Sequence, residues 1–275
     1  MTGAPSLRAA ADWLALRGTA DEEARDRGAA GLLGELTGFL ADREVAALQV
    51  VDLGAGTGAN GRYLQPRLRW PQEWVVVDHD AEHLSHLAHE GAVRVEAGIG
   101  QLPGALKDLG RPDGAVRLVT CAALLDVLTE EELAGVAQLV VDSGGPALLS
   151  LTVDGRVQWS PHDPADDLVG RVFDRHQQRH GRPGPAAGDV VTRLLTDRSS
   201  ADGLAVRRAQ TDWRLGPGTP RLLRRWLHER MEAVLDEEPD LAADVTDWHR
   251  RRTGQLRSGQ LQVLVGHTDL LVLPR

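Results

Sequence analysis

The chain has 275 residues, a net charge of −9 and a single cysteine, Cys121. The length is enough for one large domain or two small ones with a sizeable core. One cysteine excludes a disulfide framework and a multi-cysteine zinc or iron–sulfur site. The acidic balance argues against a protein whose main task is to neutralise a nucleic-acid backbone. There is no apolar run of about 18 residues, and Asp12 and Arg17 interrupt the first apolar stretch. We therefore expect a cytoplasmic protein without membrane or signal segments, acting as a monomer or homodimer.

The predicted elements begin with a helical region over residues 1–44, which we expect to form an N-terminal cap. From residue 45 onward, short apolar runs alternate with helical stretches, a pattern typical of a parallel sheet covered on both faces. The predicted strands are Leu48–Val51, Trp74–Val77, Ala92–Glu96, Val116–Thr120, Pro146–Val153, Leu204–Arg214 and one within Leu261–Leu273. The predicted helices between them cover Arg62–Leu68, Ala81–Glu90 and Glu130–Val141, the last with Thr129 as its N-cap.

Two segments interrupt the alternation of strands and helices. Residues 154–187 are rich in proline, glycine and histidine, and we predict a helix over Ala165–His180. Residues 216–259 contain two further predicted helices, Pro220–Leu235 and Leu241–Gln255. Insertions at strand ends commonly form lids or pocket walls. We therefore expect one domain over residues 45–275 that carries helical cap insertions.

The most informative segment is VVDLGAGTGANG, residues 50–61, where a predicted strand enters a glycine loop. Glycines let the backbone approach a ligand closely, and the helix that follows presents free N–H groups to an anionic group. The glycines are spaced GxGxG, unlike the GxGxxG of dinucleotide sites. Asp52 also stands where a nicotinamide site normally has an apolar residue. A ligand with a free amino group would use that acid.

A second acid lies at the end of the next predicted strand. Asp78 closes the run VVVD, 20 residues after Gly58. A carboxylate at such a strand tip can accept hydrogen bonds from both hydroxyls of a ribose. The plainer alternative is an ordinary strand-to-helix turn in which Asp78 caps the following helix. The loop, Asp52 and Asp78 together favour a ligand site.

This combination resembles the class I S-adenosylmethionine-dependent methyltransferases, most closely over Val45–Val153. The resemblance implies an α/β, doubly wound, Rossmann-like seven-stranded sheet with an antiparallel final strand, and S-adenosylmethionine as the cofactor. In that family the loop holds the methionine end of the cofactor, and the acid after the second strand holds the ribose. The positions that the resemblance assigns to the cofactor are Asp52, Gly54, Ala55, Gly56, Gly58, Asn60, Asp78, His79, the backbone around Ile99 near the adenine, and Cys121. Phrases such as DWLALR (12–17) and WSPHDP (159–164) look like a group of bacterial methyltransferases without an assigned substrate.

Methyl transfer is a displacement at a methyl group on a positively charged sulfur, so an enzyme mainly supplies alignment and a dry pocket. A general base is needed only where the acceptor must lose a proton. No motif identifies such a base. Our candidates are Asp126, His162, Asp163 and His176, with His180 on the same predicted helix as His176. Each also has a structural alternative as a turn cap or as part of a solvated helix face.

Aromatic and basic residues near the cap are further candidates. Trp159, Trp213 and Trp226 either line the substrate side of the pocket, where an aromatic face attracts a sulfonium, or simply pack the lid. Arg17 and Arg25 either reach the cofactor carboxylate or form ion pairs on the helix surface.

Four histidines, His79, His83, His86 and His89, lie in or beside the predicted helix Ala81–Glu90, and the first three recur at a helical spacing that is compatible with metal ligation. We expect this helix to pack through Leu84 and Leu87, which leaves the histidines on its outer faces, and we expect no metal site. His267 lies in an apolar strand and is expected to be a hydrogen-bonded core residue.

We predict an enzyme that methylates a small molecule. Arginine-rich stretches at 221–230 and 250–252 raise an RNA methyltransferase as an alternative, but residues 207–259 hold 11 arginines against 9 acids and no basic track interleaved with aromatic residues. A non-catalytic nucleotide-binding or regulatory module on the same fold is a second alternative. A nicotinamide-dependent oxidoreductase is disfavoured by Asp52 and by the glycine spacing.

Overall fold

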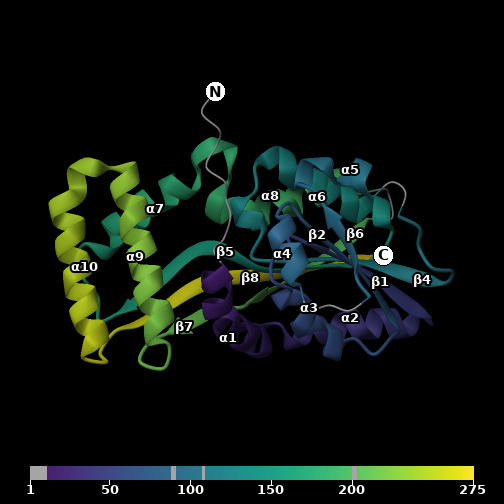
Figure 1. Cartoon of the computed structure of the whole chain (residues 1–275), viewed down its shortest axis with the longest axis horizontal. Coiled ribbons are helices and arrows are strands. Elements are labelled where there is room, and N and C mark those ends of the chain that lie inside the picture. Colours follow the sequence, from purple (N-terminus) through teal and green to yellow (C-terminus); the bar gives the residue numbers. More distant parts are fainter. Residues whose placement is uncertain (1–10, 88–90, 107–108, 200–202) are drawn as a thin grey trace.

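The computed structural model describes residues 11–87, 91–106, 109–199 and 203–275 (Figure 1). Its strands are β1 (Ala47–Leu53), β2 (Gln72–Asp78), β3 (Val93–Glu96), β4 (Ala115–Ala122), β5 (Ala147–Ser160), β6 (Leu204–Gln210), β7 (Trp213–Leu215) and β8 (Gln262–Pro274). Its α-helices are α1 (Ala11–Gly28), α2 (Ala30–Asp42), α3 (Ala59–Leu64), α4 (Ala81–His86), α5 (Leu102–Ala105), α6 (Glu130–Ser143), α7 (Asp166–Gln177), α8 (Ala187–Arg198), α9 (Pro220–Glu237) and α10 (Ala242–Arg257).

The strands form one sheet in the order β3-β2-β1-β4-β5-β8-β6, with β7 beside β8. The neighbours from β3 to β5 are parallel, whereas β8 runs antiparallel to both β5 and β6. The predicted doubly wound, Rossmann-like sheet of seven strands with an antiparallel last strand is therefore confirmed. The short β7 adds an eighth strand that the sequence pattern had merged with β6.

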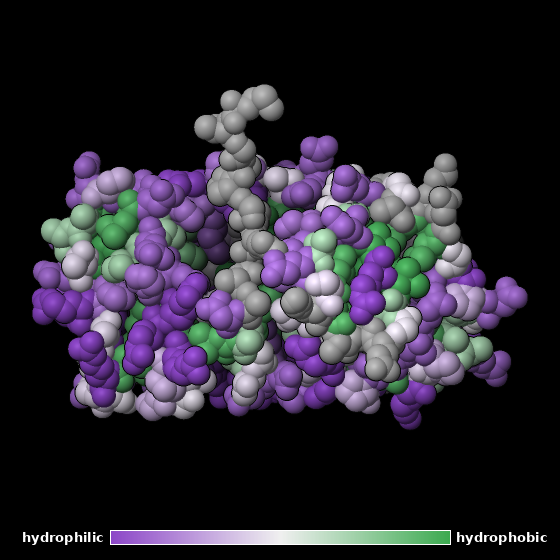
Figure 2. Space-filling view, in the orientation of Figure 1, coloured by the Kyte–Doolittle hydropathy of each residue, from purple (hydrophilic) through white to green (hydrophobic). Residues whose placement is uncertain are grey.

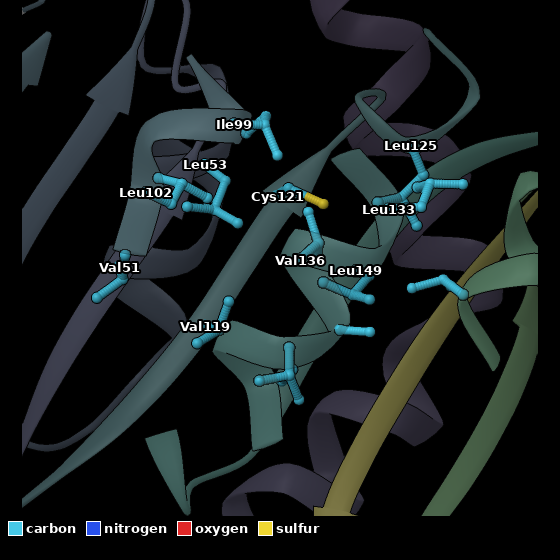
Figure 3. Packing of buried hydrophobic residues seen from close by; sticks show 14 of the residues in the cluster. Val51, Leu53, Ile99, Leu102, Val119, Cys121, Leu125, Leu133, Val136 and Leu149 are labelled. Carbon is cyan, nitrogen blue, oxygen red and sulfur yellow. The ribbon is translucent and has the colours of Figure 1, made fainter. Parts of the chain in front are cut away.

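Side chains of the central strands alternate between two cores, because successive residues of a strand point to opposite faces. Val51, Leu53 and Cys121 belong to the core beneath α6 and α8 (Figure 3). Leu48 and Val50 belong to the core beneath α2 and α3. The same alternation places the side chain of Cys121 in the α6 core, where burial raises the pKa of its thiol.

A third core lies where β5 and β8 continue past the rest of the sheet. Helices α7, α9 and α10 pack together at this end, seen on the left of Figure 1. The pairing of β5 with β8 has register shifts between Leu149 and Thr152 and between Val153 and Val157. At the first shift, Leu151 has a left-handed φ of 57°, and its N–H donates to Asp269 Oδ1 at 2.7 Å. The irregularity separates the sheet proper from the extension of β5 and β8 that carries the helices, where β7 pairs with the other edge of β8; we call this extension the β5–β8 ribbon.

Several predicted elements have the expected bounds within a few residues. Helix α6 begins after Thr129, whose hydroxyl accepts from the Glu132 N–H in a capping box. Helices α7, α9 and α10 lie within the predicted insertions. Strand β5 is longer than predicted, because β8 pairs with it as far as Ser160. Helix α8 was missed, and α4 ends at His86, with residues 88–90 of the predicted helix outside the described residues.

Most of the side chains on the face shown in Figure 2 are hydrophilic. Among the described residues, Val93 is the one large hydrophobic side chain that is exposed, at 42%. Within the same residues, no helix combines the length and the apolar character needed to span a bilayer.

Candidate functional site

A cavity of about 730 Å³ opens at the carboxyl ends of β1, β2 and β4. This is where the strand order reverses, which is the usual ligand position in open α/β sheets. One side is formed by the glycine loop and the tips of β2 and β4, and the other by α1, α7, α9 and the β5–β8 ribbon. The predicted site residues that line it are Gly54, Ala55, Gly56, Asn60, Asp78, His79, Ile99 and Asp126.

The glycine loop adopts a conformation that side chains would oppose. Gly54, Gly56 and Gly58 all have left-handed φ values, between 52° and 80°. A Cβ on Gly54 would lie 2.8 Å from Leu124 Cδ1, closer than such contacts allow. The loop therefore presents bare backbone to the cavity, as a closely fitting ligand requires.

Asp78 holds this loop from the tip of β2. Its Oδ2 accepts from the Gly56 N–H at 2.7 Å, and its Oδ1 accepts from the Asp80 N–H at 2.9 Å. The cap of α4 is Asp80, whose side chain accepts from the N–H groups of Glu82 and His83. The alternative in which Asp78 caps that helix is therefore wrong. Asp78 lines the cavity, and each of its oxygens retains a lone pair for a further donor.

Asp52 lies one layer behind the cavity wall. The alternation along β1 turns its side chain toward α3, where Oδ1 accepts from Asn60 Nδ2 at 2.7 Å. The residue is 1% exposed, and within the described part of the chain its Oδ2 has no hydrogen-bond partner. Burial raises the pKa of this carboxyl to about 7. Asn60, not Asp52, lines the cavity, and the acid holds the Asn60 side chain from behind.

Arg25 joins the N-terminal helix to the same buried group. Its Nη1 donates to Asn60 Oδ1 at 3.0 Å, and its Cζ lies 3.8 Å from the centre of the Tyr63 ring. Its Nε is 3.9 Å from Asp269 Oδ2 on β8. The chain of polar groups Asp269–Arg25–Asn60–Asp52 therefore connects α1, α3, β1 and β8 behind the cavity.

Arg17, one of the two arginines proposed for the cofactor, lines the cavity from α1. Its Nε donates to Asp21 Oδ2 at 2.8 Å, and its Cζ stands 5.1 Å from the centre of the Trp213 ring. Trp213 Nε1 also donates to Asp21, at 2.9 Å. This arrangement holds a guanidinium at the rim of the loop, within the same cavity as Gly56.

The far end of the cavity is formed by residues beyond β4 and by the inserted helices. Ala123 and Leu151 on its wall both have left-handed φ values, 53° and 57°. Such strain in non-glycine residues is concentrated at functional sites. Asp126 lies beside them, and its buried Oδ1 has no hydrogen-bond partner among the described residues. Burial raises the pKa of the Asp126 carboxyl.

The other three candidates for the base lie away from the cavity. His162 is 69% exposed, with Nδ1 3.7 Å from Asp166 Oδ2. Asp163 accepts from Arg251 Nε at 2.6 Å, which holds the pKa of its carboxyl at about 2. His176 faces α9, where its Nε2 is 3.3 Å from Asp236 Oδ2. These side chains lie on the faces of the insertion that meet solvent or neighbouring helices.

Two of the three proposed tryptophans, Trp213 and Trp226, line the cavity. Trp159 instead packs in the third core, with ring centres 5.4 Å from Trp226 and 5.6 Å from Trp248. His267 is buried as predicted, with Nδ1 3.0 Å from the Val265 carbonyl oxygen, and it also lines the cavity. Burial lowers the pKa of His267 to about 4, so its imidazole is neutral at physiological pH.

Two histidines, His79 before α4 and His83 on α4, lie beside Asp78. His79 Nδ1 is 3.3 Å and His83 Nδ1 is 4.0 Å from Asp78 Oδ1. Leu84 and Leu87 are buried as predicted, whereas the side chain of His86 and all of His89 lie outside what is described. In the described ranges, no group of three or more histidine, cysteine or acidic side chains is arranged to hold a metal ion.

Five further residues of α7 and α9 line the cavity and were not predicted from the sequence, namely Phe173, Asp174, Gln177, Glu229 and Arg230. A signal for Arg230 was present. The buried stripe of α9 runs through Leu223, Trp226, Leu227 and Val234, and Arg230 falls on that stripe. A charged residue on the apolar face of an amphipathic helix indicates a special role.

No family model matches the chain, and no curated protein does. Similar solved structures exist, at low identity. The cyclopropane synthase MmaA2 from Mycobacterium tuberculosis is 13% identical, with 82% of this chain and 78% of that one covered and a TM-score of 0.41. The plantazolicin methyltransferase BpumL, in complex with S-adenosylhomocysteine, is 8% identical, with 94% and 85% covered and a TM-score of 0.42. A phosphoethanolamine N-methyltransferase from Haemonchus contortus, also bound to S-adenosylhomocysteine, is 8% identical, with 88% and 53% covered and a TM-score of 0.39. The likeness concerns the fold alone.

Proposed function

We propose that this chain is an S-adenosylmethionine-dependent methyltransferase that transfers a methyl group to a small molecule by direct displacement. One observation carries the proposal. Asp78, at the tip of β2, lines the same cavity as a left-handed GxGxG loop and holds the Gly56 N–H of that loop. A strand-tip carboxylate beside a bare glycine loop fits a ribose and the adjoining chain of an adenosyl ligand.

The residues fit the cofactor as follows. Asp78 would accept hydrogen bonds from the ribose hydroxyls, and the backbone around Ile99 would contact the adenine. Gly54–Gly58 would lie along the methionine end, with the Arg17 guanidinium placed for its carboxylate. When bound, the cofactor supplies an activated methyl group on a sulfonium. Asp52 acts indirectly, because it holds Asn60 against the cavity.

The acceptor would enter between the tip of β4 and the inserted helices. We propose that residues 1–44 and the insertions near 154–187 and 216–259 form a cap on the methyltransferase domain, residues 45–275, and that this cap excludes water from the reacting atoms. A cavity of about 730 Å³ suits a small molecule better than an RNA strand. The single cysteine favours the cytoplasm.

The cofactor assignment is tested by thermal unfolding with S-adenosylmethionine, S-adenosylhomocysteine and NAD⁺. A ligand present at 100 times its dissociation constant stabilises the fold by about 2.7 kcal/mol, which raises the midpoint of a domain of this size by roughly 5–10 °C. We expect this shift with the two adenosyl-sulfur ligands and none with NAD⁺. A shift with NAD⁺ alone would contradict the proposal. Binding without turnover across a broad acceptor screen would favour the regulatory alternative.

We expect Asp126 to act as the general base where the acceptor must lose a proton. Burial raises the pKa of its carboxyl, which makes the carboxylate a stronger proton acceptor than an exposed one. With an acceptor found by screening, Asp126→Asn should lower kcat by roughly 10²–10⁴-fold and remove the acidic limb of the pH profile. Its affinity for S-adenosylhomocysteine should stay within about twofold of wild type, as an order-of-magnitude expectation. His176→Gln, on the neighbouring insertion, is the matched control and should leave kcat unchanged. An unaltered kcat in Asp126→Asn would mean that the acceptor is already deprotonated when it binds.

A further inference from the structure

The far end of the cavity contains a buried positive charge without an acid paired to it. Arg230 on α9 is 4% exposed and lines the cavity. Among the residues that the structure describes, its guanidinium makes no hydrogen bond and no ion pair, and its Nε is fully buried without a partner. A buried charge that lacks a partner is costly to a folded protein, by several kcal/mol in typical cases. A site that retains one is expected to use it.

Two aromatic rings lie beside this guanidinium. Its Cζ lies 4.1 Å from the ring centre of Phe173 and 4.9 Å from that of Trp226. Both rings also line the cavity. Because neither ring carries a conventional hydrogen-bond acceptor, the N–H groups of Arg230 remain for a ligand. A guanidinium offers two parallel donors, the geometry that matches a carboxylate.

The neighbouring acids do not neutralise Arg230 by direct contact. Asp166 is engaged by Trp248 Nε1 at 2.9 Å and by the guanidinium of Arg252. Asp174 lines the cavity and attracts Arg230 from beyond ion-pair distance. Burial lowers the pKa of Arg230 to about 10, so the group stays charged at neutral pH. Because Asp126, Asp174 and Glu229 line the same cavity, we expect a ligand with one negative charge to bind better than a ligand with two.

We propose that Arg230 binds the carboxylate of the methyl acceptor, and that the acceptor is an acidic small molecule with an apolar body. The body would lie along Val153, Val157 and Trp226, which line the cavity together with Arg230. Gln177 has a buried Oε1 without a hydrogen-bond partner among the described residues, and it offers an acceptor to an N–H or O–H group of the same molecule. This inference rests on the proposed function, since it concerns the acceptor end of that site.

The test is calorimetric titration of the full chain, with and without S-adenosylhomocysteine. The probes are 4-hydroxybenzoate, phenylacetate and indole-3-acetate, each beside its neutral carboxamide, with phenyl phosphate as the dianion. Arg230→Met removes the charge but keeps an apolar side chain beside the two rings, and Arg230→Lys keeps the charge without the two parallel donors. Arg224→Gln, an exposed arginine on the same helix, is the matched control.

We expect at least one carboxylate to bind about 10-fold or more tightly than its amide, as charged hydrogen bonds predict. Arg230→Met should lose that preference, Arg230→Lys should retain part of it, and Arg224→Gln should behave as wild type. The unfolding midpoint of Arg230→Met should equal or exceed that of wild type, because an unpaired buried charge has been removed.

Three results would overturn the inference. One is a panel in which no carboxylate outbinds its amide, or in which phenyl phosphate binds best. Another is an Arg230→Met variant with undiminished carboxylate binding. The third is an Arg230→Met variant that loses affinity for S-adenosylhomocysteine as well, which would assign the charge to the cofactor. Failure of the wild-type chain to bind S-adenosylhomocysteine would instead refute the proposed function, while the titrations without that ligand still report on Arg230.

Discussion

Asp78→Ala should weaken binding of S-adenosylhomocysteine by about 100-fold or more. The two hydroxyls of the ribose would donate to one carboxylate, and hydrogen bonds to a charged group contribute about 1.5–3 kcal/mol each. The same substitution also frees the Gly56 N–H, which Asp78 Oδ2 now accepts at 2.7 Å. Isothermal titration of both proteins measures the loss. Glu96→Gln is the matched control, because Glu96 is the register partner of Asp78 on β3 and is exposed at the same sheet edge.

Loss of the ribose contact and collapse of the loop can be separated by a second ligand. An analogue of S-adenosylhomocysteine without the ribose hydroxyls should bind wild type weakly. The Asp78→Ala variant should bind this analogue no more weakly than it binds S-adenosylhomocysteine. The two ligands and the two proteins form a thermodynamic cycle around the ribose contact, and the variant has already lost that contact. A loss of affinity of about threefold or less in Asp78→Ala would be smaller than the contribution of one hydrogen bond to a charged group. That result would show that Asp78 does not bind the ribose.

Asp52→Asn should change how the stability of the protein depends on pH. Burial raises the pKa of the Asp52 carboxyl from 3.8 to about 7, so between these values the native state holds a proton that the unfolded chain releases. The contribution of Asp52 to the free energy of unfolding therefore falls as pH rises through this window, by roughly 4 kcal/mol in total. Since asparagine does not titrate, the difference in stability between variant and wild type should shift in favour of the variant by that order between pH 4 and pH 8.

Urea unfolding at intervals of one pH unit measures the effect. The change of the free-energy difference with pH is more informative than the difference at any single pH. Asp163→Asn is the opposite control. The pKa of Asp163 is held at about 2 by Arg251, so its carboxyl is ionised in both states above about pH 5. The difference in the free energy of unfolding between Asp163→Asn and wild type should therefore stay constant over most of the pH range. Parallel stability curves for Asp52→Asn and wild type would show that the Asp52 carboxylate is already compensated by Arg25 through Asn60.

The glycine loop and Asp78 were predictable because their signals are local. Backbone conformation at Gly54–Gly58 and the end of an apolar strand are both encoded within a few residues. The direction of Asp52 was also within reach of the sequence. Strand alternation puts it on the same side as Val50, away from Leu53, and so toward α3.

The acceptor end was much harder to predict, because it is assembled from elements distant in sequence. Phe173 and Arg230 meet only because α7 and α9 pack against each other on the β5–β8 ribbon. The histidines and Asp163 of the first insertion were plausible by residue type alone, yet His162 and Asp163 lie in the segment before α7, and His176 faces α9. Helix α8 was missed because no apolar strand follows it until Leu204. The segment between the first insertion and that strand therefore had no clear helix boundary in the sequence.

The place of β8 in the sheet has a consequence for the order in which the molecule assembles. This strand is the last of the eight in the sequence, yet it lies between β5 and β6 and contributes Asp269 to the group that holds Arg25 and Leu151. During synthesis β1 to β5 can pair as they emerge, while β6 must wait for a neighbour that is translated later. The contacts that join α1 to β8 span more than two hundred residues, and such non-local closure is slow. Ligand binding should accordingly be among the last properties that a refolding chain regains, well after most of its helical signal.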